Sequence, residues 1–306
     1  MILDHAAGQG KGRKRLGWTA LIGGAFVSGL LLMGVALFWP AGDTHPPPKV
    51  SPFAEPESRL PADKGEGAPD VEQRGSMLAI VVGDLGYDPV RDAEWLDFPA
   101  KITMAVLPFG PSSRNVASSA QSRGHSVILH VPMEPRSSSA DGTEPFLLRV
   151  GMERQEIAER LARMDQEVPQ AVGAMNHMGS AFTTDPDSMD AFTETLKKMG
   201  YFFVDSATAS DTLGLSAAGK AGVSAVLRDV FFDDDPAPDA MRRQWGRAVS
   251  LAKKNGWAVL VCHSRRETLN TLIGLLPSLR KDGIRPVTIP ELLEESAPGG
   301  GPAGEG

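Results

Sequence analysis

Short apolar runs alternate with amphipathic stretches along most of this chain, and this alternation constrains the fold more than any other feature. Each run has the length and composition of a single strand that is buried on both faces. The segment 153–167, whose apolar side chains recur at helical spacing, is typical of the helices expected between the runs. The predicted strands are 77–82, 102–107, 127–131, 171–174, 201–204, 225–227, 257–261 and 285–288.

Strands that alternate with helices form parallel sheets through right-handed crossovers, so the sequence predicts an α/β fold. Two architectures fit this pattern, a (β/α) barrel and an open doubly wound sheet. No Gly-x-Gly-x-x-Gly fingerprint follows the first predicted strand, and the sequence contains no phosphate loop. We therefore expect no nucleotide cofactor and prefer a barrel of about seven parallel strands.

The N-terminus differs in composition from the rest of the chain. A basic cluster at residues 11–15 precedes an uncharged stretch from Leu16 to Pro40, which is long enough to span a bilayer. The position of the basic cluster predicts that residues 1–16 stay in the cytoplasm. We favour a single-pass signal-anchor at 17–39 in the inner membrane, with the C-terminal domain on the exported, periplasmic or extracellular side. A cleaved signal peptide is the alternative.

Segments rich in Pro and Gly flank the predicted domain. Residues 40–75 are expected to form a disordered linker and residues 296–306 a disordered tail, which leaves 76–295 as the folded domain. The net charge of -7 argues against a nucleic-acid partner. The single cysteine, Cys262, excludes an intrachain disulfide and is expected to be a small buried apolar residue.

Titratable side chains stand at the carboxyl ends of several predicted strands. His130 interrupts an apolar run that two prolines soon end, and His177 and His263 follow later strands. Asp84 and Asp205 are the first acids after two other strands. Because the carboxyl ends of parallel strands converge on one face, these groups can lie close together. A carboxylate with two imidazoles is a common catalytic ligand set for zinc and related divalent metals.

Several consecutive motifs resemble those of the divergent polysaccharide deacetylase family, and the resemblance covers about Met77 to Leu293. It implies a NodB-like, distorted (β/α) barrel. It also implies a metal-dependent enzyme, commonly with zinc, that removes acetyl groups from polysaccharides. The motifs are Gly-Asp-Leu-Gly-Tyr at 83–87, His-Val-Pro-Met-Glu-Pro at 130–135, Asn-His-Met-Gly-Ser at 176–180, Asp-Ser at 205–206 and Arg-Asp-Val-Phe at 228–231.

The resemblance also implies roles for individual residues. Asp84, His130 and His177 match the metal ligands, and His263 matches the acid that protonates the leaving group. Asp205 would orient the site or balance its charge. His125 would stand on the opposite face of the strand from His130 and is interpreted as structural.

Three further residues, Asn176, Ser180 and Asp229, are predicted to bind substrate. Alternative roles remain open for them: Asn176 and Ser180 could shape a turn, and Asp229 could pair with Arg228. The acidic run 233–235 is interpreted as a solvated loop and not as a cation site.

Gly83 departs from the family pattern, which usually has two adjacent acids after the first strand. The first of those acids is the catalytic base, and a glycine cannot accept a proton. Either another acid such as Asp205 or Glu134 takes that role, or the activity is reduced or lost. Two functions therefore stay open: a membrane-tethered deacetylase of a cell-envelope or secreted glycan, and a catalytically impaired relative that binds a glycan or an envelope partner.

Overall fold

The computed structural model describes residues 75–137 and 146–296. Strands and helices alternate in it as predicted, except that the short strands 225–227 and 230–231 follow one another without a helix between them. The strands are β1 (Ser76–Leu85), β2 (Thr103–Val106), β3 (Ser126–Met133), β4 (Gly173–Met178), β5 (Phe202–Asp205), β6 (Ala225–Leu227), β7 (Val230–Phe231), β8 (Trp257–His263) and β9 (Ile284–Val287). The helices are α1 (Pro89–Leu96), α2 (Ser113–Ser122), α3 (Arg154–Glu167), α4 (Pro186–Met199), α5 (Gly214–Ala221), α6 (Pro238–Asn255), α7 (Arg266–Leu275), α8 (Pro277–Lys281) and α9 (Ile289–Ser296), with a 3-10 turn η2 (Phe182–Thr184).

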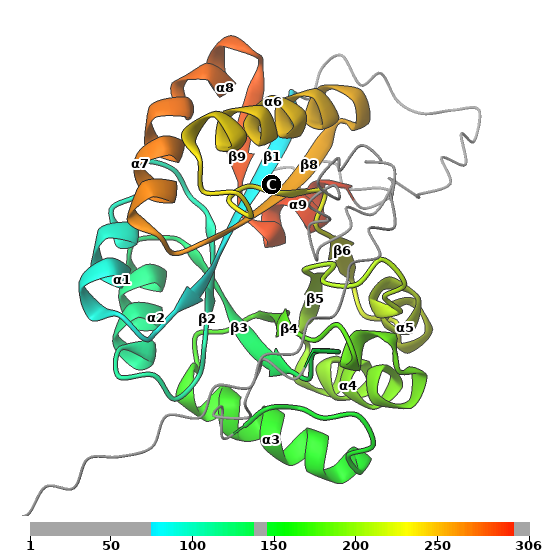
Figure 1. Cartoon of the computed structure of the whole chain (residues 1–306). Helices are drawn as coiled ribbons and strands as arrows, with labels where there is room; N and C mark the ends of the chain where they lie inside the picture. The colour runs from blue at the N-terminus through cyan, green and yellow to red at the C-terminus, as the bar shows by residue number, and fades with distance from the viewer. Residues whose placement is uncertain (1–74, 138–145, 297–306) are drawn as a thin grey trace, which may run out of the picture. The chain divides into compact units, whose positions relative to one another are not determined.

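The strands form one curled, half-barrel parallel sheet, and most of the helices cover its outer face (Figure 1). The strand order is β6-β5-β4-β3-β2-β1-β8-β7, and β9 pairs with β1. The two ends of this order are neighbours along the chain. The amide of Arg228 donates to the Asp205 carbonyl (2.9 Å), and the next amide, of Asp229, donates to the Val259 carbonyl in β8 (2.9 Å). This short segment bridges the two edges of the sheet, so the open doubly wound alternative is excluded.

Local sequence signals fix where the helices begin and end, and α4 illustrates them. The carboxylate of Asp185 accepts a hydrogen bond from the Ser188 amide (2.9 Å), and Pro186 occupies the first turn. Gly200 ends the helix in the left-handed conformation, with φ of 73°. α1 starts in the same way, after Asp88.

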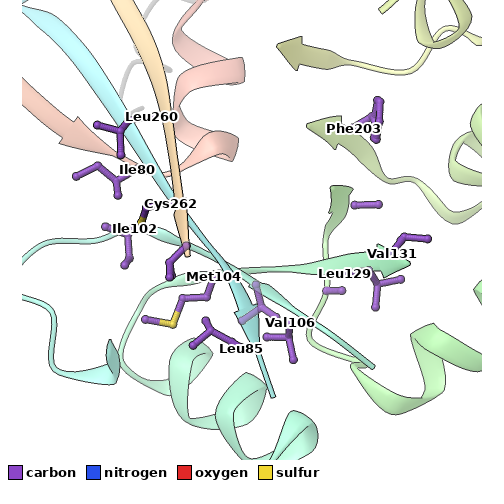
Figure 2. Packing of buried hydrophobic residues seen from close by; sticks show 14 of the residues in the cluster. Ile80, Leu85, Ile102, Met104, Val106, Leu129, Val131, Phe203, Leu260 and Cys262 are labelled. Carbon is purple, nitrogen blue, oxygen red and sulfur yellow. The ribbon is translucent and has the colours of Figure 1, made fainter. Parts of the chain in front are cut away.

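Alternation along the strands sorts the buried side chains into two clusters. The outer cluster lies between the sheet and the helices and includes Ile80, Met104, Leu129, Phe203 and Leu260 (Figure 2). Cys262 is buried in this outer cluster, as predicted. The inner cluster lies within the curve of the sheet and takes its fully buried members from the strands and the α9 segment, among them Val81, Ile128, Met175, Val204, Val261 and Leu292. Inner side chains therefore point into the half-barrel, and those nearest the carboxyl ends of the strands face the space at that end.

Within residues 75–137 and 146–296, no helix combines the length and the apolar composition needed to cross a bilayer. The predicted signal-anchor at 17–39 lies outside these described residues. So do the basic segment before it, the linker up to residue 74 and the tail from residue 297.

His125 precedes β3 and makes buried structural contacts. Its Nε2 lies 3.1 Å from the Leu96 carbonyl oxygen, and its Nδ1 accepts from the Ile102 amide at 3.4 Å. This pair of contacts requires a neutral ring with its proton on Nε2. Burial correspondingly lowers the pKa of His125.

We expect His125 to make the folded protein less stable as the pH falls below about 6.5, the ordinary histidine pKa. In that range the unfolded chain binds a proton that the folded state resists, so the free energy of unfolding falls with pH. Urea unfolding at pH 7.5 and 5.5 measures the loss of unfolding free energy on acidification. This loss should be smaller in His125→Gln than in the wild type, by up to about 1.4 kcal/mol per pH unit. Equal losses in the two proteins would contradict this assignment.

Candidate metal centre

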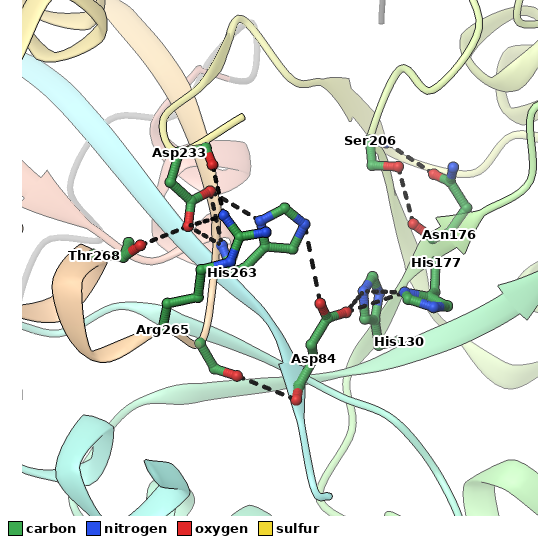
Figure 3. Close-up of polar contacts among 10 residues, drawn as sticks. Asp84, His130, Asn176, His177, Ser206, Asp233, His263, Arg265 and Thr268 are labelled. Carbon is green, nitrogen blue, oxygen red and sulfur yellow. Dashed lines mark hydrogen bonds and ion pairs between the residues drawn. The ribbon is translucent and has the colours of Figure 1, made fainter. Parts of the chain in front are cut away.

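Asp84 projects from an irregularity near the end of β1. The register between β1 and β2 shifts between Val82 and Leu85, so that Gly83 and Asp84 together oppose one residue of β2. Asp84 has a φ of 63°, which is uncommon for a residue other than glycine. A bulge of this kind re-aims a side chain, and the Asp84 carboxylate points toward two imidazoles from other strands (Figure 3).

These two imidazoles, of His130 and His177, come from the neighbouring strands β3 and β4, where Pro132 pairs with His177. Both rings continue the inward-facing sets of their strands, which contain Ile128 and Met175. His130 Nδ1 lies 3.4 Å from the Met175 carbonyl oxygen, and this contact leaves Nε2 facing the carboxylate. Burial lowers the pKa of His130, which favours the neutral ring that a metal ion requires.

Three potential ligand atoms form a compact triangle. Asp84 Oδ1 lies 3.1 Å from both His130 Nε2 and His177 Nδ1, and the two nitrogens are 3.3 Å apart. With bonds of about 2.0–2.1 Å, the corners of a tetrahedral zinc site are about 3.3–3.4 Å apart. The triangle therefore fits three corners of such a site, and a carboxylate with two imidazoles suits zinc chemically. The structure thus brings together Asp84, His130 and His177, the three residues predicted to be metal ligands.

A cavity of about 470 Å³ opens over this triangle. One of its walls is apolar and includes Phe231 and Val261. The other wall, which we call the polar wall, carries hydroxyl and amide groups and consists of Asn176, Ser180, Ser206, Thr208 and Ser210. Such a cavity can receive a polar ring on one side and a small apolar substituent on the other.

His263 faces the triangle from the end of β8. Its Nε2 lies 4.0 Å from Asp84 Oδ2, and its Nδ1 lies 3.0 Å from Asp233 Oδ1. Asp233 is fully buried and also accepts hydrogen bonds from the His263 amide (3.1 Å) and the Thr268 hydroxyl (2.6 Å) (Figure 3). Asp233 therefore fixes both the position of the imidazole and the face that it presents to the cavity.

The interpretation of 233–235 as a solvated loop is wrong for Asp233, although Asp234 and Asp235 are exposed. The position of Asp233 in the sequence could have indicated its burial. Asp233 is the first acid after the apolar run 230–232, the same placement that indicated Asp84. Three consecutive acids, however, are typical of a solvated loop, so this position was not recognised.

Asp205 is buried but faces away from the cavity. Its Oδ1 accepts from the Ala207 amide (2.8 Å) and its Oδ2 from the Thr212 hydroxyl (2.8 Å). The preceding Val204 belongs to the inner cluster, so strand alternation turns Asp205 outward. Burial raises the pKa of this carboxyl. Asp205 shapes the loop after β5, and its position gives no support to the predicted catalytic role.

Glu134 and Asp229 are also absent from the cavity wall and take part in the framework instead. Glu134 Oε2 accepts from the Val150 amide (2.8 Å), and Asp229 Oδ2 accepts from the Val259 amide (2.8 Å). The carboxylate of Glu134 thus ties the loop after β3 to the segment before α3. That of Asp229 joins the bridging segment to β8.

Asn176 and Ser180 line the cavity, as expected for substrate-binding residues, and also shape its rim. Asn176 Oδ1 accepts from the Ser206 amide (2.8 Å), and the Ser180 hydroxyl accepts from the Arg136 amide (2.9 Å). The structure is therefore compatible with both roles predicted for these two residues, substrate binding and the shaping of a turn.

Gly83 lies directly against the imidazole of His130. A Cβ at position 83 would stand 3.1 Å from His130 Nε2 and 3.5 Å from Met175 Cε. The missing side chain therefore leaves room for the nitrogen that faces Asp84.

We expect Gly83→Ala to weaken zinc binding by about 10-fold, the cost typical of disturbing a group that supports a metal ligand. The added methyl group must displace the His130 ring by a few tenths of an ångström. Competition with a chromophoric chelator measures the affinity. Gly246→Ala is the matched control, because a Cβ at that position in α6 meets nothing within 4 Å. Equal affinities in the two variants would show that His130 tolerates the side chain.

Comparison with known proteins agrees with the motifs. The sequence model of the divergent polysaccharide deacetylase family matches residues 80–293. The uncharacterized protein YibQ of Escherichia coli (strain K12) is 36% identical over 218 residues, which cover 71% of this chain and 67% of YibQ. An uncharacterized protein of Haemophilus influenzae (strain ATCC 51907 / DSM 11121 / KW20 / Rd) is 34% identical over 207 residues, 68% of this chain and 73% of that protein.

The fold also has a counterpart among solved structures. The crystal structure of the uncharacterized protein ATU2773 from Agrobacterium tumefaciens C58 superposes with a TM-score of 0.69 at 24% identity, and covers 78% of this chain and 93% of that one. The family match and the two relatives confirm the resemblance drawn from the motifs. The chain belongs to the divergent polysaccharide deacetylase family.

Proposed function

We propose that this protein is a zinc-dependent deacetylase that hydrolyses acetyl groups on a cell-envelope or secreted polysaccharide. Membership of the family supports the reaction class. The observation that carries the proposal is the triangle of Asp84, His130 and His177 at the floor of the cavity, whose edges suit a tetrahedral ion.

A divalent ion held by these three residues would polarise the acetyl carbonyl and increase the acidity of a bound water. Side chains of the cavity would bind the substrate and donate the proton. The polar wall would receive the sugar hydroxyls, and the apolar wall with Phe231 would receive the acetyl methyl group. His263, fixed by Asp233, would donate a proton to the departing sugar nitrogen or oxygen.

We further propose that the protein is held in the inner membrane by residues 17–39, with the domain on the exported side. The basic cluster followed by an uncharged, bilayer-length stretch supports the anchor and its orientation. The Pro- and Gly-rich segment that follows would then tether the domain within reach of a polymer.

Acetate release tests the activity. The zinc-loaded protein is incubated with acetylated xylan, chitin oligosaccharides and peptidoglycan, and free acetate is measured with a coupled enzymatic assay. We expect release from one of them by the wild type and none by Asp84→Asn. A zinc-loaded wild type that releases no acetate from any of the three would contradict the proposal.

A glycan-binding protein without turnover is the second candidate, and Gly83 favours it because no carboxylate occupies that position. Co-sedimentation with insoluble chitin or peptidoglycan separates the two candidates. Retention of the polymer together with no acetate release would favour the binding protein.

A further inference from the structure

Few of the described residues that line the cavity can exchange a proton with a substrate. Among the described residues that line it, Arg136 and Arg228 are permanently charged, and burial raises the pKa of the Cys262 thiol well above its ordinary value. The carboxylates of Asp205 and Glu134 are bonded elsewhere, as described above. Apart from Asp84, His130 and His177, His263 is the remaining side chain that can exchange a proton near neutral pH among the described residues of the cavity lining.

His263 is built as an oriented imidazole. Its Nδ1 lies 3.0 Å from the buried carboxylate of Asp233, so Nδ1 carries the proton and Nε2 faces the triangle. Asp233 is itself held by the Thr268 hydroxyl and the His263 amide. The Asp233 carboxylate thus orients the His263 imidazole toward the part of the cavity where the substrate would react. The same arrangement occurs in other sites where a histidine takes up and returns one proton.

Gly83 pairs in register with His263, across the β1–β8 ladder. A carboxylate at position 83 would have been a second proton acceptor beside the ligands, but this chain has only a backbone there, with the His130 ring packed against it. Position 83, beside His263, therefore offers no base.

We propose that His263 performs both proton transfers of the hydrolysis, with Asp233 as its positioning residue. His263 Nε2 accepts a proton from the attacking water as the new C–O bond forms. It then returns that proton to the sugar nitrogen or oxygen as the acyl bond breaks. The products are the free amine or alcohol and acetic acid, which keeps the second proton of the water until it ionises in solvent, and the imidazole ends neutral. This inference rests on the proposed deacetylase function.

An activated ester distinguishes a residue with both roles from one that acts only as the acid. In 4-nitrophenyl acetate the departing nitrophenolate is stable without a proton, so only the base is needed. The full-length zinc-loaded protein should hydrolyse it, and His263→Ala should lower kcat/KM by about 100-fold or more with its zinc content unchanged. If His263→Ala stays within a few-fold of the wild type, His263 is the acid alone and the proposal is overturned, while the deacetylase function stands.

Asp233→Asn tests the positioning role. Asparagine keeps the size of the side chain but allows the wrong tautomer of His263, so kcat should fall by about 100-fold or more while KM and zinc content stay the same. Asp235→Asn, in the same acidic run but exposed, should behave as the wild type. Equal kcat values for the two variants would remove Asp233 from the scheme. A zinc-loaded wild type that hydrolyses neither the ester nor any acetylated glycan would instead overturn the deacetylase function, and this inference with it.

Discussion

His130→Ala and His177→Ala are each expected to abolish stoichiometric zinc binding. Each ring supplies one of the three ligand atoms that lie within 3.3 Å of one another, and a site with two protein ligands cannot hold the ion at ordinary concentrations. The loss of affinity should exceed about 100-fold, the upper end of what removal of a supporting group costs. Metal analysis of the purified variants after zinc loading and dialysis measures the effect.

The matched control for these variants is His125→Gln. It also removes a buried histidine, but one whose partners are the Leu96 carbonyl and the Ile102 amide at the other end of β3. This variant should retain one ion per chain. If His130→Ala and His177→Ala retained it too, the ligands would have to be sought elsewhere.

Arg228→Ala is expected to lower the free energy of unfolding by about 3 kcal/mol, because two hydrogen bonds from a charged group are lost at about 1.5 kcal/mol each. Arg228 is only 3% exposed. Its Nε donates to the Ser206 carbonyl (2.6 Å), its Nη2 donates to the Ala207 carbonyl (3.0 Å), and its guanidinium lies 4.8 Å from the centre of the Phe231 ring. The side chain joins the loop after β5 to the segment that bridges the sheet edges.

Urea unfolding measures this loss of stability. Arg243→Ala, which removes an exposed arginine from α6, should change the free energy of unfolding by less than about 0.5 kcal/mol. Similar midpoints and slopes for the two variants would show that the buried guanidinium does not stabilise the contact between the loop after β5 and the segment that bridges the sheet edges.

The strands and the meeting of His130 with His177 could be predicted from the sequence because their signals are local. An apolar run specifies a buried strand, and period-two alternation places the side chains that follow it. His130 and His177 continue the inner sets of β3 and β4, and the convergence of parallel strands brings them together.

The behaviour of the acids could not be predicted in the same way. Asp84 and Asp205 are both the first acid after a strand, yet a bulge in β1 turns Asp84 toward the cavity, whereas regular alternation turns Asp205 away. The bulge depends on the pairing of β1 with β2, which no pattern within β1 reveals. Asp233 was missed for a related reason: its burial results from contacts with Thr268 and His263, which are distant in sequence.

The bridge between the two edges of the sheet is also a tertiary feature. The apolar run near Val226 continues almost directly into that near Phe231, and the sequence alone does not show that the first pairs with β5 and the second with β8. The change of partner occurs between Arg228 and Asp229. It places Arg228 and Phe231 in the lining of the cavity.

The most direct test of the metal centre is an anomalous diffraction map, recorded at the zinc absorption edge, from crystals of the zinc-loaded protein. We predict one strong peak about 2.0–2.2 Å from each of Asp84 Oδ1, His130 Nε2 and His177 Nδ1. A map without a peak among these three atoms, from crystals grown with excess zinc, would contradict the assignment of this site as a metal centre.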